Sequence, residues 1–191
     1  MKVDFFIVGA PKAGTTSLYH YLTEHPEVEM SREKEPDYFS DEAIQKQGLY
    51  YGNNRIDTEE KYYSLFNVES KNVIFGEASV SYLFYKSVAG DIKKYNANAK
   101  IIIILRNPID RAFSHYLMDY RLGLVSDSFE DIINKKSKHK NAHLFYQQYI
   151  KVGEYATQLK RYFDIFDKEN ILLVDYEDFK SDVTGTVNSV Y

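Results

Sequence analysis

Asp4-Phe-Phe-Ile-Val-Gly-Ala-Pro-Lys-Ala-Gly-Thr-Thr-Ser17 is the most informative segment of this chain for its fold class. Its first five residues form a largely apolar run, which is typical of a strand in a parallel sheet whose two faces are both covered. Gly9 ends this strand. A helix is predicted from about Thr15 to His25, because Pro26 disfavours helical geometry in the residue before it. Strand, glycine-rich loop and helix in this order form an arrangement that binds phosphate at a helix N-terminus.

The loop between this strand and this helix carries several groups that can bind one anion. They are the backbone amides, the helix dipole, the Lys12 ammonium and three hydroxyls, contributed by Lys12, Ala13, Gly14, Thr15, Thr16 and Ser17. The loop resembles a Walker A loop, but no Lys-Ser/Thr pair follows the second glycine, and Lys12 stands two residues before it. Nucleoside triphosphatases use that pair with Mg²⁺ to manage the charge of a phosphoryl group. A sulfuryl group carries less negative charge, so the shifted lysine favours metal-free sulfuryl transfer.

Strands continue to alternate with helices along the chain. Apolar runs predict further strands at Asn72–Gly76, Lys100–Leu105 and Ile171–Val174. Helices are predicted at 86–95, at 108–123 behind an Asn107 cap, from Glu154 and at the end of the chain, and a capping box at 128–131 predicts a shorter one. Residues 26–70 are predicted to form loops with short helices. This alternation predicts an α/β, P-loop-containing three-layer fold with a central parallel β-sheet flanked by helices.

Composition excludes several classes of protein. The chain has 191 residues, of which 44% are hydrophobic, so one core and a single domain over residues 1–191 are expected. The absence of cysteine excludes disulfides, thiolate zinc sites and cysteine nucleophiles, and no metal site is predicted. The net charge of −4 argues against a nucleic-acid partner. The first apolar run is too short for a signal sequence or a membrane span, so a cytoplasmic protein is expected.

A second group of polar residues surrounds the strand that ends at Leu105. Arg106 follows this strand directly, at the edge of the sheet where ligands bind, and Ser114 lies about two turns into the next helix. An arginine fork and a hydroxyl in these positions could bind a second phosphate. In isolation they would be ordinary surface groups.

Together these motifs resemble the sulfotransferase family. The stretch 11–18 is similar to its 5'-phosphosulfate loop, and 106–114 is similar to its 3'-phosphate site. Weaker similarities to the carbohydrate branch, which includes heparan sulfate sulfotransferases, occur in the same order at Lys34–Phe39, Gly76–Ser79 and Gly153–Tyr155. The resemblance covers essentially the whole chain. It implies 3'-phosphoadenosine 5'-phosphosulfate (PAPS) as the donor, without metal, and a small-molecule or glycan acceptor.

The resemblance also implies a role for each matching residue. Lys12 would contact the bridging oxygen, while residues 13–17 would hold the 5'-phosphosulfate and Arg106 and Ser114 the 3'-phosphate. Glu35 matches the carboxylate that similar enzymes use as general base. His20 and His115 are rival candidates for the base, since both lie near the predicted donor site.

The chain departs from the family pattern at three points. Asp37 replaces a histidine that often follows the base by two residues, and Ala78 replaces a lysine of the heparan-type enzymes. Both changes remove positive charge, so a neutral or lightly charged acceptor is expected in place of a heavily sulfated one. The sequence ends at Tyr191, before the basic C-terminal loop of the family, so the domain is expected to lack that segment.

Two other functions fit the same motifs. A P-loop kinase could use Asp175, which follows the last strand, as its Mg²⁺ ligand, although the position of Lys12 counts against it. A non-catalytic nucleotide-binding module would bind the donor without turnover. The sequence does not indicate the acceptor or the oligomeric state.

Overall fold

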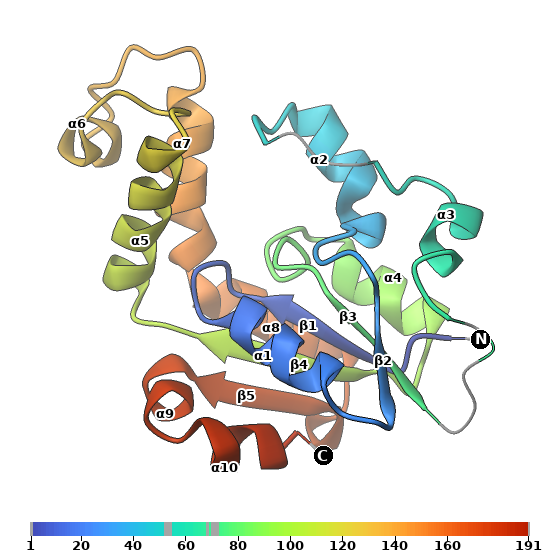
Figure 1. The fold of residues 1–191 in the computed structure, drawn as a ribbon. Coiled ribbons are helices and arrows are strands. Elements are labelled where there is room, and N and C mark those ends of the chain that lie inside the picture. Colours follow the sequence, from blue (N-terminus) through green and yellow to red (C-terminus); the bar gives the residue numbers. More distant parts are fainter. Residues whose placement is uncertain (1, 52–54, 68, 70–72, 191) are drawn as a thin grey trace.

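One parallel sheet forms the centre of the chain (Figure 1). The computed structural model describes residues 2–51, 55–67, 69 and 73–190. The strand order is β2-β3-β1-β4-β5, and every neighbouring pair is parallel. The strands are β1 (Phe5–Gly9), β2 (Val28–Met30), β3 (Ile74–Ala78), β4 (Lys100–Leu105) and β5 (Ile171–Asp175). Because all strands run the same way, their carboxyl ends meet at one edge of the sheet.

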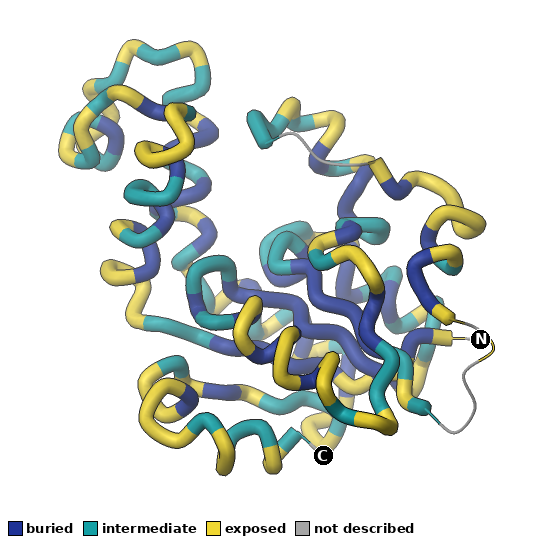
Figure 2. The backbone as a smooth tube through the Cα atoms, in the orientation of Figure 1, coloured by how far each residue is buried: buried dark blue, intermediate teal, exposed yellow. Residues whose placement is uncertain are grey.

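Helices cover both faces of the sheet, which makes the predicted three layers (Figure 1). On one face lie α1 (Thr15–Thr23), α9 (Tyr176–Ser181) and α10 (Val183–Asn188), and on the other lie α4 (Val88–Tyr95) and α8 (Tyr155–Ile165). Strand β1 is buried along its whole length, and Figure 2 shows the buried backbone concentrated in the central strands. The continuous apolar runs of the sequence are therefore explained by two covered faces.

Two further helices form an arm beside the sheet (Figure 1). Helix α5 (Pro108–Arg121) begins as predicted, with the Asn107 side chain accepting a hydrogen bond from the Ile109 amide at 2.9 Å. It packs against α7 (Ala142–Tyr149), which was not predicted, and α6 (Phe129–Ile133) lies beside α7. A separate apolar cluster fills this arm, formed by Ala112, Val125, Ile132, Phe145 and Tyr149.

Residues 26–70 contain the predicted short helices, here α2 (Asp41–Gln47) and α3 (Glu59–Tyr63). They also contain β2, which the prediction missed because three residues are too few to show an alternating pattern. Strand β3 begins at Ile74 and continues to Ala78, two residues beyond the predicted end; Asn72 lies outside the described residues. Short 3₁₀ turns complete the secondary structure at Tyr38–Ser40, Lys151–Gly153 and Lys168–Asn170. In the described part of the chain, no helix combines the length and apolar composition needed to cross a membrane.

Candidate active site

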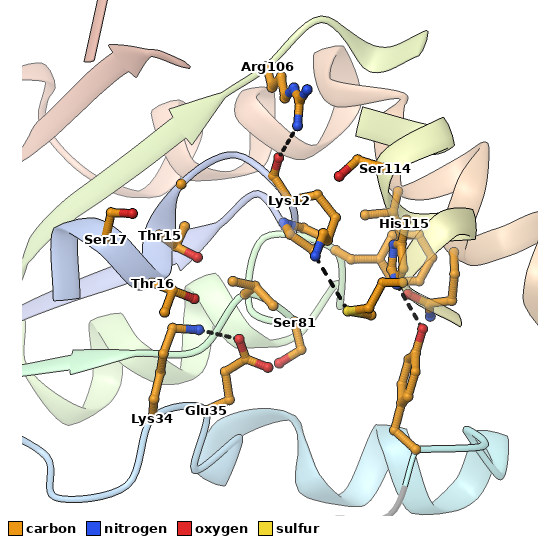
Figure 3. Close-up of a pocket in the computed structure, with 18 of the residues that line it drawn as sticks. Lys12, Thr15, Thr16, Ser17, Lys34, Glu35, Ser81, Arg106, Ser114 and His115 are labelled. Atoms are coloured by element: carbon orange, nitrogen blue, oxygen red, sulfur yellow. Dashed lines mark hydrogen bonds and ion pairs between the residues drawn. The ribbon is translucent and has the colours of Figure 1, made fainter. Parts of the chain in front are cut away.

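A cavity of about 920 Å³ lies beside the loop between β1 and α1. It brings together nearly all the residues predicted from sequence, namely Lys12, Gly14, Thr15, Thr16, Ser17, Glu35, Arg106 and Ser114 (Figure 3). Ala13 does not line it: the residue is fully buried, and its amide donates to the Ala10 carbonyl at 3.2 Å. The predicted donor loop, the predicted second phosphate site and the predicted base thus share one cavity.

Backbone conformations that L-residues rarely adopt are concentrated at this cavity. Four non-glycine residues of the described chain have left-handed φ values, and three of them line the cavity: Lys12 (66°), Glu35 (60°) and Asp37 (54°). Such conformations cost free energy and tend to occur at functional sites. Gly14 caps α1 with φ 88°, and a Cβ there would lie 3.3 Å from Phe179. The loop is therefore closely packed against α9.

The Lys12 ammonium points into the cavity, 3.4 Å from the Met118 sulfur (Figure 3). Burial lowers the pKa of Lys12, because the charged form loses hydration. The negative charges of Asp119 and Glu35 oppose this shift, while Arg106 adds to it. Lys12 is thus a partly desolvated cation held between acidic groups and a second cation.

Arg106 extends from the end of β4 toward the same loop. One guanidinium nitrogen donates to the Lys12 carbonyl at 3.1 Å, and the guanidinium lies 4.7 Å from the Tyr176 ring centroid, a cation–π contact. The Nε atom is buried and has no hydrogen-bond partner among the described residues. Ser114, on α5, also lines the cavity. An unsatisfied buried donor next to a hydroxyl is a site that an anionic oxygen would satisfy.

Glu35 lies on the opposite side of Lys12 from Arg106 (Figure 3). Its amide donates to the Ala78 carbonyl at 2.8 Å, which attaches this segment to the end of β3. Its carboxylate pairs with the Lys34 ammonium through Oε1, and Oε2 has no partner among the described residues. A carboxylate with one oxygen free toward the cavity is placed to accept a proton.

A buried acidic network lies behind Glu35. The Asp37 carboxylate accepts a hydrogen bond from Ser81 at 2.5 Å, while the Asp37 amide donates to Ser79 at 3.0 Å, and Ser79 donates to Glu77 at 2.7 Å. Burial raises the pKa of Asp37 and the pKa of Glu77 to about 7 each. From the sequence, Asp37 was notable only as a departure from the family pattern, but in the structure it lines the cavity.

The two histidine candidates differ in position. His20 is exposed on α1 and does not line the cavity. His115 lines it, but burial and the nearby Arg111 lower its pKa to about 3. One ring nitrogen of His115 lies 2.7 Å from the Tyr51 hydroxyl and the other 3.3 Å from Arg111. Both nitrogens are engaged, so Glu35 is better placed as a base.

His115, a candidate base from the sequence, belongs to a buried polar stripe on α5 whose other members, Arg111 and Asp119, were not predicted. Arg111, His115 and Asp119 are spaced four residues apart, and all three are buried. Asp119 accepts hydrogen bonds from three tyrosine hydroxyls, Tyr50 at 2.6 Å, Tyr51 at 2.7 Å and Tyr149 at 2.7 Å. The spacing is visible in the sequence and places these residues on one helix face. Their burial depends on the neighbouring segments, which the sequence did not reveal.

Asp175, the candidate Mg²⁺ ligand of the kinase alternative, has a structural role. Its carboxylate caps α9 by accepting a hydrogen bond from the Glu177 amide at 2.7 Å, and it does not line the cavity. Within residues 2–51, 55–67, 69 and 73–190, no three His, Asp or Glu side chains are grouped so that they could hold a metal ion.

Comparisons with known proteins identify the family to which this chain is similar. Residues 2–191 match the model of the sulfotransferase domain family. The chain is 28% identical to human carbohydrate sulfotransferase 15 over 98% of its own length and 42% of the relative's. It is 29% identical to the bifunctional heparan sulfate N-deacetylase/N-sulfotransferase 1 of Caenorhabditis briggsae, over 98% of this chain and 22% of that protein. The chain therefore spans less than half the length of these curated relatives.

Solved structures show the same architecture. The sulfotransferase of Alicyclobacillus acidocaldarius is 34% identical, with a TM-score of 0.84 over 100% of this chain and 79% of that one. A mouse sulfotransferase complexed with PAP is 18% identical, with a TM-score of 0.57 over 100% of this chain and 57% of that one, a likeness of fold alone.

Proposed function

This chain belongs to the sulfotransferase family, and we propose that it transfers a sulfuryl group from PAPS to a hydroxyl or amine of a carbohydrate or another small acceptor. One observation carries the proposal. The anion-binding loop, Arg106 and Glu35 line a single cavity, with Arg106 and Glu35 on opposite sides of Lys12. A donor site and a proton acceptor on either side of a partly buried cation are what group transfer to a hydroxyl requires.

The donor half of the cavity has the groups that a doubly phosphorylated nucleotide needs. Residues 14–17 supply the N-terminus of α1 and three hydroxyls for the 5'-phosphosulfate, and Arg106 with Ser114 would hold the 3'-phosphate. The buried, unpaired Nε of Arg106 supports this fit, because a phosphate oxygen would supply its missing acceptor. When bound, PAPS supplies the activated sulfuryl group.

The remaining chemistry falls to Lys12 and Glu35. The Glu35 carboxylate takes the proton from the acceptor hydroxyl as the acceptor oxygen bonds to sulfur and the bond from sulfur to the bridging oxygen breaks. The Lys12 ammonium stabilises the negative charge that develops on the bridging oxygen. Its partial burial strengthens this effect, since water screens the charge less.

Isothermal titration with 3'-phosphoadenosine 5'-phosphate (PAP), first in EDTA and then with Mg²⁺, tests the donor site. We expect micromolar binding without metal that is lost in Arg106→Ala, whereas Lys160→Ala, an exposed change on α8, leaves it intact. Binding of ATP only, and only with Mg²⁺, would instead identify a kinase. PAP binding without transfer to any acceptor would identify a non-catalytic nucleotide-binding module.

A further inference from the structure

The part of the cavity beyond Glu35 is here called the acceptor half. Its lining differs from that of the donor half, which contains the loop between β1 and α1 and Arg106. The acceptor half is formed by residues 33–51, which include α2, and by the turn that follows β3. Its apolar lining comes from Ile44, Leu49, Val80 and Phe84, together with the rings of Tyr51 and Tyr85. A surface of this kind gains free energy by covering an apolar body, at roughly 25 cal/mol per Å² of apolar area buried.

The charges of this half are mainly negative. Glu33, Lys34, Glu35 and Asp37 are its charged lining residues, and the only cation among them is Lys34, which already pairs with Glu35. The other cations of the lining, Lys12, Arg106 and Lys180, belong to the donor loop, to the end of β4 and to α9. The described acceptor half therefore offers no unpaired cation to a sulfated chain, and like charges in a poorly hydrated cavity repel.

Besides the proposed base Glu35, Asp37 is a polar group of this half that is available to a ligand. Its Oδ1 atom accepts from Ser81, while Oδ2 has no hydrogen-bond partner among the described residues. The residue is held in place by its left-handed backbone and by the hydrogen bond from its amide to Ser79. Ala78, the other departure from the heparan-type pattern, is fully buried in β3 and does not line the cavity. Of these two departures, Asp37 is therefore the one that lines the cavity.

We propose that this half binds the apolar body of an uncharged or cationic alcohol or amine, and that Asp37 accepts a hydrogen bond from that acceptor. The inference rests on the proposed sulfuryl transfer and narrows its substrate class. The raised pKa of Asp37 fits this role, because a neutral or cationic hydrogen-bond donor compensates a desolvated carboxylate, whereas a sulfate does not. By the same argument, the described lining of this half is poorly suited to a polyanionic glycan.

Binding and transfer with three probes test this proposal. Octyl β-D-glucoside, octylamine and de-N-sulfated heparin are titrated into the PAP-loaded protein, and transfer of labelled sulfate from PAPS is measured for each. We expect octyl glucoside or octylamine to bind at least about tenfold more tightly than the heparin derivative, and to be sulfated with correspondingly higher kcat/KM. Preferred binding of the heparin derivative, or no binding of either octyl compound, would overturn the proposal.

Substitutions at Asp37 and Phe84 test whether these two residues bind the acceptor. In Asp37→Asn we expect KM for the octyl acceptor to rise at least about tenfold while kcat changes little and the Kd for PAP is unchanged. Phe84→Ala should weaken the octyl compounds but not methyl β-D-glucoside, and Phe163→Ala, on the outer face of α8, serves as the matched control. An unchanged KM in Asp37→Asn contradicts the role of Asp37. If the wild type does not bind PAP, the proposed function itself fails, which is a different result.

Discussion

Individual residues at this site combine charge with partial or full burial, and that combination sets their chemistry. Lys12 is a cation whose pKa burial lowers, and Asp37 and Glu77 are carboxyls whose pKa values burial raises to about 7. Each shift reflects the cost of keeping a charge in a poorly hydrated place. Groups with shifted pKa values are common at functional sites. Lys12 and Asp37 line the cavity, and Glu77 is connected to Asp37 through Ser79.

Replacing Lys12 tests the role of this partly buried cation. In Lys12→Ala we expect kcat to fall by about 10²- to 10³-fold, because the charge that stabilises the leaving oxygen is removed. Steady-state assays with labelled PAPS measure this, with Lys160→Ala as a control at an exposed lysine on α8. Normal transfer by Lys12→Ala would show that the loop does not act on the donor as proposed.

The buried Glu77 makes stability depend on pH. Its pKa is about 7 in the folded chain and near 4.3 when unfolded, so between these values the folded state binds more protons. This contribution is fully present at low pH and is lost as the pH rises through about 7. We expect Glu77→Gln to reduce the fall in unfolding free energy between about pH 5 and pH 8 by on the order of 1 to 3 kcal/mol.

Urea unfolding at the two pH values measures the effect of Glu77. Asp37 titrates in the same direction, so part of the pH dependence should remain in Glu77→Gln. The exposed Glu24, substituted in the same way, should leave the pH dependence unchanged. An unaltered pH dependence in Glu77→Gln would mean that Glu77 is not the titrating group.

At the scale of elements, close packing inside the sheet determines what each strand tolerates. Gly76 of β3 pairs with Phe5 of β1, and a Cβ at Gly76 would lie 2.1 Å from the Phe5 ring and 2.6 Å from the Met30 sulfur. Strands β1, β2 and β3 are therefore packed so closely at Gly76 that there is no room for a side chain. Helix α4 contains the opposite case, since a Cβ at Gly90 would meet nothing within 4 Å.

A pair of glycine substitutions tests this difference. Gly76→Ala should lower the free energy of unfolding by about 1 to 3 kcal/mol, since Phe5 or Met30 must leave its packed position. Gly90→Ala should instead raise it by about 0.5 to 1 kcal/mol, because alanine favours the helix and meets open space. Denaturant midpoints of the two variants measure the contrast, and equal effects would contradict the packing argument.

At the scale of the whole molecule, the cavity exists because several separate segments converge on it. The loop before α1, the segment 33–51, the turn after β3, the end of β4 with α5, and α9 all contribute to its lining. Asp119 of α5 connects two segments beside the cavity, since it accepts hydrogen bonds from Tyr50 and Tyr51, before α3, and from Tyr149 on α7. Ligand binding should therefore stabilise the fold as a unit.

Thermal unfolding tests that coupling. PAP at 100 times its Kd should add about 2.7 kcal/mol to the free energy of unfolding, which a rise in Tm reports. Arg106→Ala should abolish the rise at the same PAP concentration. A wild-type Tm that does not respond to PAP would contradict nucleotide binding by the folded chain.

Local sequence signals predicted the parts of the fold whose cause is local. The apolar runs of β1 and β4, the Asn107 cap of α5 and the glycine loop each depend on neighbouring residues, and each was predicted close to its observed place. Strand β2 and helix α7 were missed, because three residues carry no pattern and α7 owes its stability to packing in the arm.

The α/β class, the glycine-rich loop and the candidate residues Lys12, Arg106 and Ser114 could all be predicted from the amino-acid order, because strand, loop and helix follow one another directly in the chain. Which distant groups lie beside them became visible in the folded chain alone. The pairing of Glu35 with Lys34, the cavity position of Asp37, the buried stripe that includes His115 and the capping role of Asp175 all depend on burial and on contacts between segments. Such contacts set pKa values and free hydrogen-bond partners, and residue spacing alone does not specify them.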